Sequence, residues 1–286
     1  MAKSSLGIWV AGARPRTLPA AVAPVIVASA LAGSAFNLVT ASLALLVSLA
    51  LQVGVNYAND YSDGIRGTDN DRIGPVRITA DGLASPARVR NAAFIAFFVA
   101  ACAGLALAFE TSWWLIAVGA VCIAAAWGYT GGKSPYGYMG LGEIFVFIFF
   151  GLVATVGTFY VQADEITGQS ILAGTIVGSL ACAILVINNI RDRAKDAVVG
   201  KRTMAVRIGD RRSRAFYTFL VAVSYLLTAG FGTPWVALTL LTLPMTISIL
   251  KPLWSGVEGA GLIPLLGKTG KLQILFSLAL SLALIP

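Results

Sequence analysis

Long apolar stretches recur along this chain, and they constrain its fold more than any other feature of the sequence. A helix that crosses a membrane needs roughly 20 mostly apolar residues. Nine stretches meet that measure, and the whole chain is 57% hydrophobic and only 12% charged. We therefore expect an all-α, polytopic membrane protein with about nine transmembrane helices. The expected helices cover residues 17–35, 37–59, 91–109, 112–130, 141–161, 170–190, 213–231, 233–250 and 270–286.

The basic residues indicate how these helices are oriented. All 21 Lys and Arg residues fall in the N-terminal segment or after even-numbered helices, whereas the opposite loops carry only Glu110, Asp164 and Glu165. Because cytoplasmic loops are enriched in Lys and Arg, we expect a cytoplasmic N-terminus. The net charge of +8 then reflects orientation, and we expect no nucleic-acid binding. We also expect no cleavable signal, since no small-residue cleavage site and soluble domain follow the first apolar stretch.

Cysteine and histidine usage narrows the chemistry. The three cysteines, Cys102, Cys122 and Cys182, all fall in apolar stretches, where a free cysteine packs as a small hydrophobic residue. The chain has no histidine, which excludes zinc or haem ligation through imidazole. The usual general base near neutral pH is therefore absent as well.

Two acidic clusters occur at the ends of apolar stretches. The first contains Asn56, Asn59, Asp60 and Asp63, with Asp69 close behind, and the second contains Asn188, Asn189, Asp192 and Asp196. In each cluster an amide and two carboxylates recur at three- to four-residue spacing, which places them on one helical face. Carboxylates at the mouth of a membrane bundle are costly unless something pairs with them. Their oxygens suit Mg²⁺ that carries a phosphorylated substrate.

The two clusters also suggest an internal repeat. Both follow even-numbered helices, so both are expected at the cytoplasmic side, four helices apart. The sequence after the first, 72–78, resembles the sequence after the second, 202–209. We interpret 1–286 as a single transmembrane domain with two weakly repeated halves, about 1–130 and 141–286, in parallel topology. Asp81 and Asp210, by contrast, are expected to be solvated loop charges.

Basic and aromatic residues near the clusters complete a candidate diphosphate site. Tyr129 and Lys133 stand four apart at an expected cytoplasmic helix end, and Glu143 begins the next helix. Lys133 either contacts a phosphate or anchors its helix at the interface, while Glu143 either pairs with a basic residue or lines the site. Cations beside a carboxylate-bound metal would neutralise a leaving phosphate. The candidate diphosphate-binding residues are Arg66, Arg72, Arg77, Lys133 and Lys201.

Three motifs carry a resemblance to a known family. They are Asn59-Asp60-x-x-Asp63 after the second helix, Tyr129-x-x-x-Lys133 after the fourth, and Asp192-x-x-x-Asp196 after the sixth. Together they resemble the UbiA superfamily of intramembrane aromatic prenyltransferases over nearly the whole chain. The segments 13–19, 59–69 and 188–192 resemble the menaquinone branch, whose acceptor is 1,4-dihydroxy-2-naphthoate. The chain departs from the wider family at Gly67 and Gly200, where a third acid often occurs.

The resemblance implies a ring of helices around a central cavity in the bacterial cytoplasmic membrane, with the active site facing the cytoplasm. It implies transfer of a polyprenyl group from polyprenyl diphosphate to 1,4-dihydroxy-2-naphthoate with loss of CO₂ and diphosphate. Tyr129 and Lys133 would join the acids in catalysis, and Tyr129 or Glu143 would handle the phenolic proton. Two Mg²⁺ ions would be held by Asn56, Asn59, Asp60, Asp63, Asp69, Asn189, Asp192 and Asp196.

Two alternatives stay open at this point. A relative in the same family could use 4-hydroxybenzoate or a tetrapyrrole as the acceptor. A cation-coupled transporter would also combine apolar helices, acidic residues and a repeat, but it places its ion site near the bilayer midplane. The clusters here are expected at helix ends on one side, which favours chemistry at the membrane surface.

Overall fold

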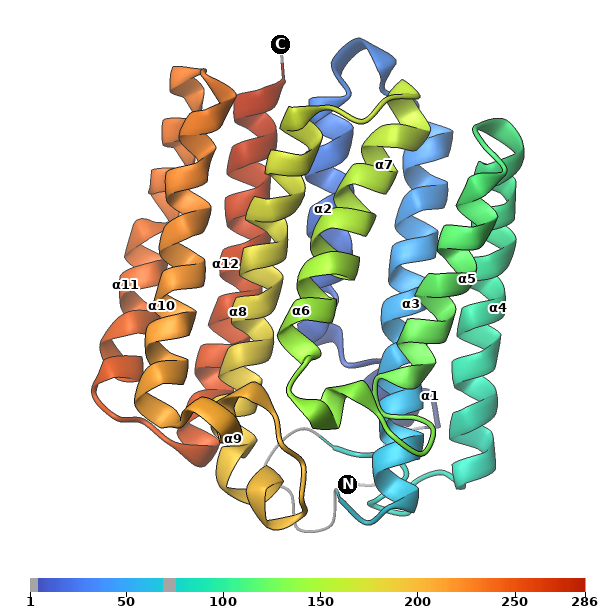
Figure 1. Ribbon diagram of the computed structural model, residues 1–286, viewed down its shortest axis with the longest axis vertical. Coiled ribbons are helices and arrows are strands. Elements are labelled where there is room, and N and C mark those ends of the chain that lie inside the picture. The colour runs from blue at the N-terminus through green and yellow to red at the C-terminus, as the bar shows by residue number, and fades with distance from the viewer. Residues whose placement is uncertain (1–4, 69–75, 286) are drawn as a thin grey trace.

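The apolar stretches form long helices, because a backbone inside lipid must satisfy its polar groups within the segment. The computed structural model describes residues 5–68 and 76–285, and Figure 1 shows a bundle of roughly parallel rods. The elements are α1 (Ser5–Ala13), η1 (Pro15–Thr17), α2 (Pro19–Leu31), η2 (Gly33–Ala35), α3 (Leu38–Ile65), α4 (Pro86–Glu110), α5 (Trp114–Gly128), η3 (Tyr136–Met139), α6 (Gly142–Val146), η4 (Phe147–Val153), α7 (Ala154–Ala163), α8 (Gly168–Val198), α9 (Met204–Ile208), α10 (Asp210–Leu227), η5 (Thr228–Phe231), η6 (Pro234–Thr242), α11 (Leu243–Trp254), η7 (Gly259–Gly261) and α12 (Leu262–Leu284).

Six helical segments of the described chain are long and apolar enough to cross a membrane. They are Leu38–Ile65, Pro86–Glu110, Gly142–Ala163, Gly168–Val198, Asp210–Phe231 and Pro234–Trp254, with shorter apolar helices at Pro19–Leu31 and Trp114–Gly128. Each of the nine predicted segments overlaps a helix, but α12 begins at Leu262 rather than at 270. Lys268, expected in a loop, therefore lies within α12, and both it and Lys271 are exposed. Long basic side chains can reach a polar interface from such positions.

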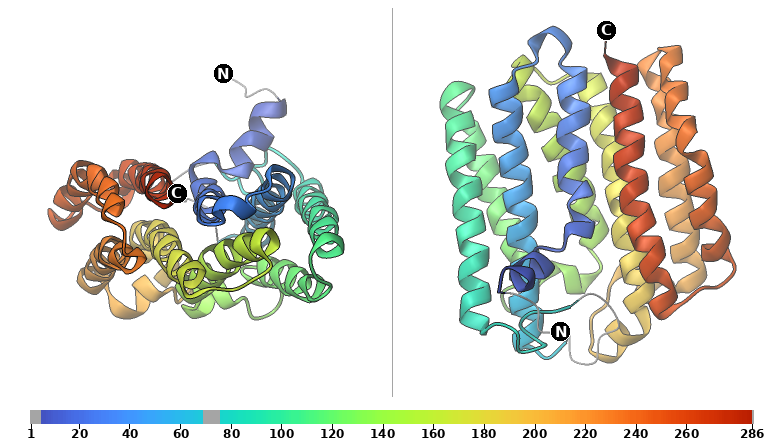
Figure 2. Two further views of the ribbon diagram at one scale, coloured as in Figure 1. Left: turned by 90° about the horizontal axis from the view of Figure 1, so that it is seen from above. Right: turned by 180° about the vertical axis from the view of Figure 1, so that it is seen from behind.

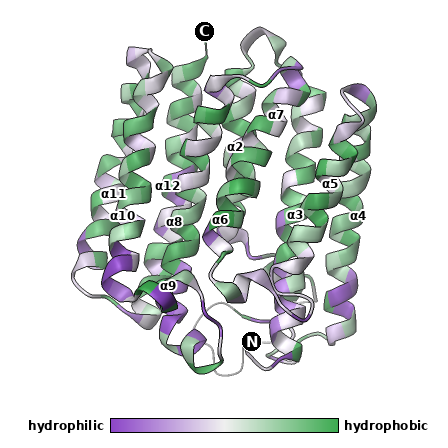
Figure 3. Ribbon diagram, viewed as in Figure 1, coloured by the Kyte–Doolittle hydropathy of each residue, from purple (hydrophilic) through white to green (hydrophobic). Residues whose placement is uncertain are grey.

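The helices enclose a cavity and present their polar residues at one end. α3 packs on α4, α2 on α12 and α7, and α8 on α10 and α12. Seen from above in Figure 2, α10 to α12 form one side of the molecule and α3 to α5 the other. Figure 3 shows hydrophilic residues gathered mainly at the end that carries α9 and the N-terminus. That end is also where the two acidic motifs lie.

Both motifs lie within continuous helices instead of the loops after them. α3 starts at an Asn37 cap, whose side chain accepts from the Val39 and Thr40 amides, and continues to Ile65. α8 starts with a reciprocal Thr167–Ser170 capping box and continues to Val198. The predicted ends at 59 and 190 were too early. Because the helices continue, the relative directions of the motif side chains are fixed by helical geometry.

The midsections of η4 and α8 cross at two glycines. A Cβ atom on Gly151 would lie 2.5 Å from the Gly178 Cα, and one on Gly178 would lie 2.9 Å from the Gly151 Cα. The contact therefore requires glycine on both sides. Residues 147–153 form a π-helix, a widened turn that often occurs at functional sites and changes the register of the residues after it. This crossing sets the distance between α8 and the wall formed by η4 and α7.

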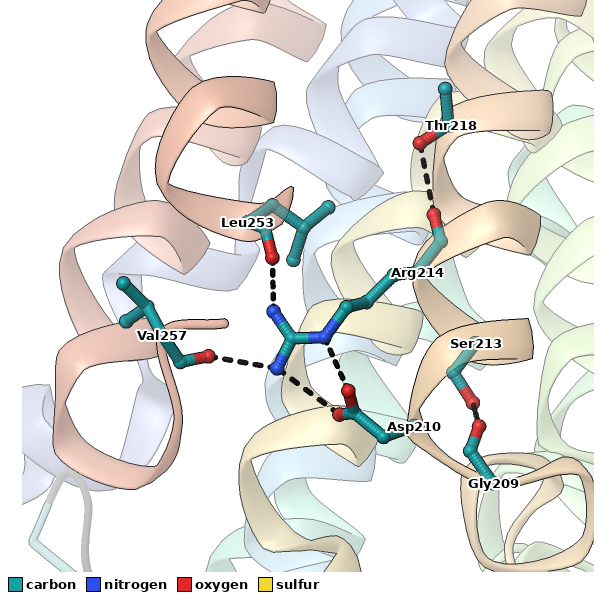
Figure 4. A network of polar contacts seen from close by, with 7 residues as sticks. All are labelled: Gly209, Asp210, Ser213, Arg214, Thr218, Leu253 and Val257. Carbon is teal, nitrogen blue, oxygen red and sulfur yellow. Dashed lines mark hydrogen bonds and ion pairs between the residues drawn. The ribbon is translucent and has the colours of Figure 1, made fainter. Parts of the chain in front are cut away.

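A buried arginine ties α10 to the end of α11 (Figure 4). Arg214 Nε donates to Asp210 Oδ2 at 2.6 Å, and its Nη2 donates to the Val257 carbonyl oxygen at 2.9 Å. Its Nη1 donates to the Leu253 carbonyl oxygen. Asp210 was expected to be a solvated charge, and it is instead the ion partner of Arg214. Asp81 agrees with that expectation: it is an exposed turn residue, and it also accepts the Arg77 backbone N–H at 3.1 Å.

Candidate functional site

A cavity of about 320 Å³ opens between the helices and joins a polar mouth to an apolar interior. The mouth is lined by side chains from the N-terminal segment, the ends of α3 and α8, and the loops near them: Arg14, Asn56, Asn59, Asp63, Arg77, Tyr129, Thr130, Asn188, Asn189 and Lys201. Deeper in, the lining is aliphatic and aromatic and includes Leu51, Leu115, Phe149 and Phe150. This division suits an amphiphile with an anionic head and a hydrocarbon tail.

Asn59 and Asp63 bring the first motif to the mouth. The Asn59 Oδ1 accepts a hydrogen bond from the Thr130 hydroxyl at 2.7 Å. The Asp63 Oδ1 accepts one from the Tyr138 hydroxyl at 2.8 Å. Thr130 and Tyr138 both come from the segment after α5. The first motif is therefore oriented by residues that follow it by about 70 positions in the chain.

Asn56 and Asp60, on the same helix, are engaged in structural contacts. Asp60 is fully buried, and its two oxygens accept the backbone N–H groups of Ile78 and Thr79 at 3.1 and 2.9 Å. Asn56 donates to the Ala13 carbonyl oxygen at 2.8 Å and accepts from Gln52. Asp60 is not brought to the cavity, whereas Asn56 lines it with its amide already bonded. Asp60 thus fixes the loop after the first motif, and Asn56 fixes the N-terminal segment.

The second motif places Asn189 at the cavity and its two acids further along α8. The Asn189 Nδ2 donates to the buried Glu143 Oε1 at 2.9 Å. Glu143 thus pairs with an amide, and not with a basic residue as one expectation held. Asp192 accepts two hydrogen bonds from Arg191 at 2.8 and 2.7 Å. Asp192 and Asp196 are each only 8% exposed.

The predicted basic residues differ in how close they lie to the cavity. Arg77 and Lys201 line the cavity, and Arg66 lies beside Tyr138, with its guanidinium bound to the Thr130 and Gly132 carbonyl oxygens. Lys133 is exposed and does not line the cavity among the described residues. The predicted roles of Asp69 and Arg72 concern positions outside the described ranges 5–68 and 76–285.

Tyr129 lines the cavity as a neutral phenol. Burial raises the pKa of the Tyr129 hydroxyl, and the nearby Glu143 carboxylate raises that pKa further. The phenol therefore keeps its proton at neutral pH and can donate a hydrogen bond. A role for Tyr129 as a base that accepts a proton is disfavoured by this environment.

The oxygen ligands present suit a metal that is shared with a substrate. Asn59, Asp63, Asn189, Asp192 and Asp196 offer only oxygen donors, which Mg²⁺ prefers. Within the described part of the chain, no three acidic or cysteine side chains gather closely enough to enclose an ion by themselves. Mg²⁺ commonly takes one or two carboxylates and completes its shell with water and substrate phosphates. The donor set therefore fits Mg²⁺ that arrives with a diphosphate.

A second chamber of about 300 Å³ adjoins the mouth and is lined by arginines, of which only Arg77 was predicted at the site. Arg14, Arg16, Arg77 and Arg191 line it, and it shares Arg14, Thr17, Arg77, Asn188 and Leu266 with the main cavity. The Nη2 of Arg14 and the Nη1 of Arg191 are buried with no hydrogen-bond partner among the described residues. Such a chamber favours an anion that can accept from guanidinium groups. Its only sequence signal is the Arg14-Pro15-Arg16 turn.

Comparison with known proteins identifies the family. The model of the UbiA prenyltransferase family matches residues 21–258. The chain belongs to the UbiA prenyltransferase family. It is 48% identical over 285 residues to a 1,4-dihydroxy-2-naphthoate octaprenyltransferase of Mycobacterium tuberculosis, with 98% of each chain covered. The resemblance drawn from the three motifs is therefore confirmed.

Solved structures show the same fold. An apo UbiA homologue from Aeropyrum pernix is 16% identical with a TM-score of 0.72, covering 91% of this chain and 96% of that one. A UbiA homologue from Archaeoglobus fulgidus bound to GPP and Mg²⁺ is 15% identical with a TM-score of 0.59, covering 96% and 99%. The expectation of an all-helical membrane fold is confirmed by these similarities.

Proposed function

We propose that this protein transfers a polyprenyl group from polyprenyl diphosphate to 1,4-dihydroxy-2-naphthoate, with loss of CO₂ and diphosphate, to give demethylmenaquinol. The observation that carries the proposal is the cavity whose polar mouth contains Asn59, Asp63 and Asn189 and whose interior is apolar. Full-length similarity to a relative named for this reaction supports the choice of acceptor. The product retains the prenyl chain, which stays in the apolar cavity or the bilayer.

The donor would bind with its diphosphate at the mouth and its tail in the cavity. Asp63, Asp192 and Asp196, with Asn59 and Asn189, would hold Mg²⁺, and two ions match the two motifs. When bound, Mg²⁺ would neutralise charge that develops on the departing diphosphate. Arg77 and Lys201 add positive charge at the mouth, and Arg66 lies beside it. The ligand named with the Archaeoglobus homologue, GPP with Mg²⁺, supports this arrangement.

The acceptor would place its carboxylate in the arginine-lined chamber. The chamber joins the main cavity through Arg14 and Arg77, so a bound carboxylate leaves the aromatic ring near the donor. Guanidinium groups recognise a carboxylate through paired hydrogen bonds. An acceptor without a carboxylate should bind less well, because buried donors on Arg14 and Arg191 would then lack partners.

The reaction balances without an added oxidant. No base is needed at the attacked ring carbon, because that carbon loses CO₂ and not a proton. The C–O bond of the donor breaks, diphosphate takes the electron pair, and an allylic cation forms. The ring carbon that bears the carboxylate attacks the cation and forms the new C–C bond. The carboxylate then leaves as CO₂, and its bonding electrons restore the aromatic ring. The apolar cavity walls exclude water that would otherwise capture the cation.

We further propose nine membrane spans, a cytoplasmic N-terminus, two repeated halves and a cytoplasmic active site. The polar end of the bundle carries the motifs and most of the Lys and Arg residues, which supports this orientation. Single cysteines placed at Ser134 and Gln169, near opposite ends of the bundle, would test the orientation. In sealed, right-side-out bacterial cells an impermeant maleimide should label position 169 and spare position 134. Labelling in the opposite pattern would contradict the orientation.

The reaction is tested with purified full-length protein in nanodiscs and a labelled polyprenyl diphosphate. The prenylated product and CO₂ should form with 1,4-dihydroxy-2-naphthoate, and EDTA should stop both. In separate parallel reactions, 4-hydroxybenzoate or a carboxylated tetrapyrrole replaces the naphthoate as the acceptor. Activity with either of these and none with the naphthoate would overturn the proposed acceptor. Cation uptake into sealed vesicles without any prenyl transfer would favour a transporter.

A further inference from the structure

Tyr138 lies where the two motifs of the site meet, although it belongs to neither. It sits in η3, between α5 and α6. Its hydroxyl donates to the Asp63 Oδ1 at 2.8 Å, which connects it to the first motif. Its carbonyl oxygen accepts the Arg202 backbone N–H at 2.9 Å, which connects it to the segment after the second motif. One residue thus contacts both parts of the candidate diphosphate site.

The ring of Tyr138 also holds a cation from each part. The Arg66 guanidinium carbon lies 5.5 Å from the ring centroid, and the Lys201 Nζ lies 5.2 Å from it. Both distances are within the range of cation–π attraction, about 6 Å. Arg66 follows α3 and Lys201 follows α8, so the same ring fixes basic side chains that originate 135 positions apart.

The backbone turn that carries Tyr138 packs closely on the segment after α8. Gly140 has a φ of +74°, which favours glycine. A Cβ atom there would lie 2.8 Å from the Arg207 Nε and 3.0 Å from the Arg202 carbonyl oxygen. The turn therefore packs directly on the segment after α8. Tyr138 is held from both sides before any ligand enters.

We propose that Tyr138 is a positioning residue that couples the metal-binding and phosphate-binding parts of this site, an inference that rests on the proposed function. Its hydroxyl holds one oxygen of Asp63, which leaves Oδ2 as the oxygen available for a metal ion. Its ring holds Arg66 and Lys201 next to the mouth that receives the diphosphate. The hydroxyl and the ring therefore have separable roles.

Two substitutions separate these roles. Tyr138→Phe removes the hydroxyl, which bonds Asp63 at 2.8 Å and Thr68 at 3.2 Å, and keeps the ring, so the Mg²⁺ concentration for half-maximal rate should rise about tenfold. At saturating Mg²⁺ its KM for polyprenyl diphosphate should equal the wild-type KM. Tyr138→Leu removes the ring as well, so its KM should rise about fivefold to tenfold at saturating Mg²⁺.

A binding measurement without turnover makes the same distinction. Mn²⁺ binding is followed by electron paramagnetic resonance with the unreactive analogue farnesyl thiodiphosphate present. Both variants should bind Mn²⁺ about tenfold more weakly, whereas only Tyr138→Leu should bind the analogue more weakly at saturating Mn²⁺. Tyr160→Phe is the matched control, because its hydroxyl bonds Trp114 at 3.2 Å, away from both motifs, and it should behave as wild type.

Two results would overturn the inference. One is wild-type Mg²⁺ and Mn²⁺ dependence in Tyr138→Phe, and the other is wild-type analogue binding in a folded Tyr138→Leu protein. Should Tyr138→Leu not fold, Tyr138→Phe alone decides the role of the hydroxyl. Absence of naphthoate prenylation by the wild-type protein would count against the proposed function instead, and the Mn²⁺ measurement would still decide the role of Tyr138.

Discussion

Two acids of one motif have different surroundings. Asp60 and Asp63 are three residues apart on α3, yet Asp60 receives two backbone N–H groups from residues 78 and 79. Asp63 lines the cavity and receives a single hydrogen bond from Tyr138. Of two identical side chains in one motif, Asp60 therefore holds a loop in place, whereas Asp63 lines the candidate site.

Asparagine substitution should separate the two roles. Asp60→Asn keeps one acceptor oxygen for two backbone donors and should reduce the free energy of unfolding by about 1–3 kcal/mol. Asp63→Asn should leave thermal stability in detergent near wild type and abolish prenyl transfer, because a charge facing the metal is lost. Thermal unfolding and prenyl transfer are measured on both variants. Unchanged stability of Asp60→Asn, or turnover retained by Asp63→Asn, would refute the assignment.

Tyr129 gives a prediction about pH. Its hydroxyl pKa is raised by burial and by Glu143, so the phenol stays protonated from about pH 6 to 9. Tyr129→Phe should therefore lower the rate by the same factor at every pH in that range. The rate is measured for both proteins across the range at saturating substrate. A titration step that is present in the wild type and missing in Tyr129→Phe would identify Tyr129 as a base.

At the residue scale the sequence predicts which side chains belong to the site better than it predicts their contacts. Asp63 and Asn189 were expected at the site from their spacing and Asn59 from the family motif, and all three line the cavity. Asp60 has the same spacing, but it bonds the backbone N–H groups of residues 78 and 79. Because every residue except proline has a backbone N–H, the sequence does not mark these partners. Tyr138 could not be found in this way, because its link to Asp63 spans 75 residues.

At the element scale, packing depends on positions that have no side chain. η4 and α8 cross at Gly151 and Gly178, where backbones touch. The apolar stretches made both helices predictable, since a hydrophobic run of this length has few alternatives in lipid. The π-helical turn in 147–153 was not predictable, because it depends on how tightly the neighbouring helix approaches.

Alanine at Gly151 should disturb this crossing. Its Cβ would lie 2.5 Å from the Gly178 Cα, and backbone atoms cannot rotate away. We expect a loss of about 1–3 kcal/mol in the free energy of unfolding, typical of an overpacked contact. Gly157→Ala is the matched control in the next turns of the same segment, since a Cβ there meets no atom within 4 Å. Equal stability of the two variants would contradict the crossing.

At the scale of the whole molecule, the bundle surrounds a cavity whose lining includes several glycines. Gly104, Gly119 and Gly157 all line the cavity. The hydrophobic stretches and the basic loops predicted the bundle and its polar end, because both follow from the cost of exposing polar groups to lipid. The cavity itself was expected only through the family resemblance, since no local pattern encodes an empty volume.

Filling this space should change which donors are used. A Cβ on Gly119 meets no atom within 4 Å, so Gly119→Leu should fold and extend into the cavity. We expect kcat/KM for a long polyprenyl diphosphate to fall by about tenfold or more, while a short one such as geranyl diphosphate is little affected. Competition between the two donors is measured for the variant and for Gly168→Leu, which lies outside the cavity lining. An unchanged preference would show that the tail lies elsewhere.

The arginine that joins α10 to α11 has a consequence for how this family changes over time. Two of the partners of Arg214 are the backbone carbonyl oxygens of Leu253 and Val257, which every amino acid supplies. Substitutions at 257 can accumulate without breaking this contact, provided that the backbone path is kept. Arg214 should then stay constant among relatives while its partner at 257 drifts, and correlated substitution would not reveal the pair. A contact of this kind is conserved through the backbone conformation and not through the identity of both residues.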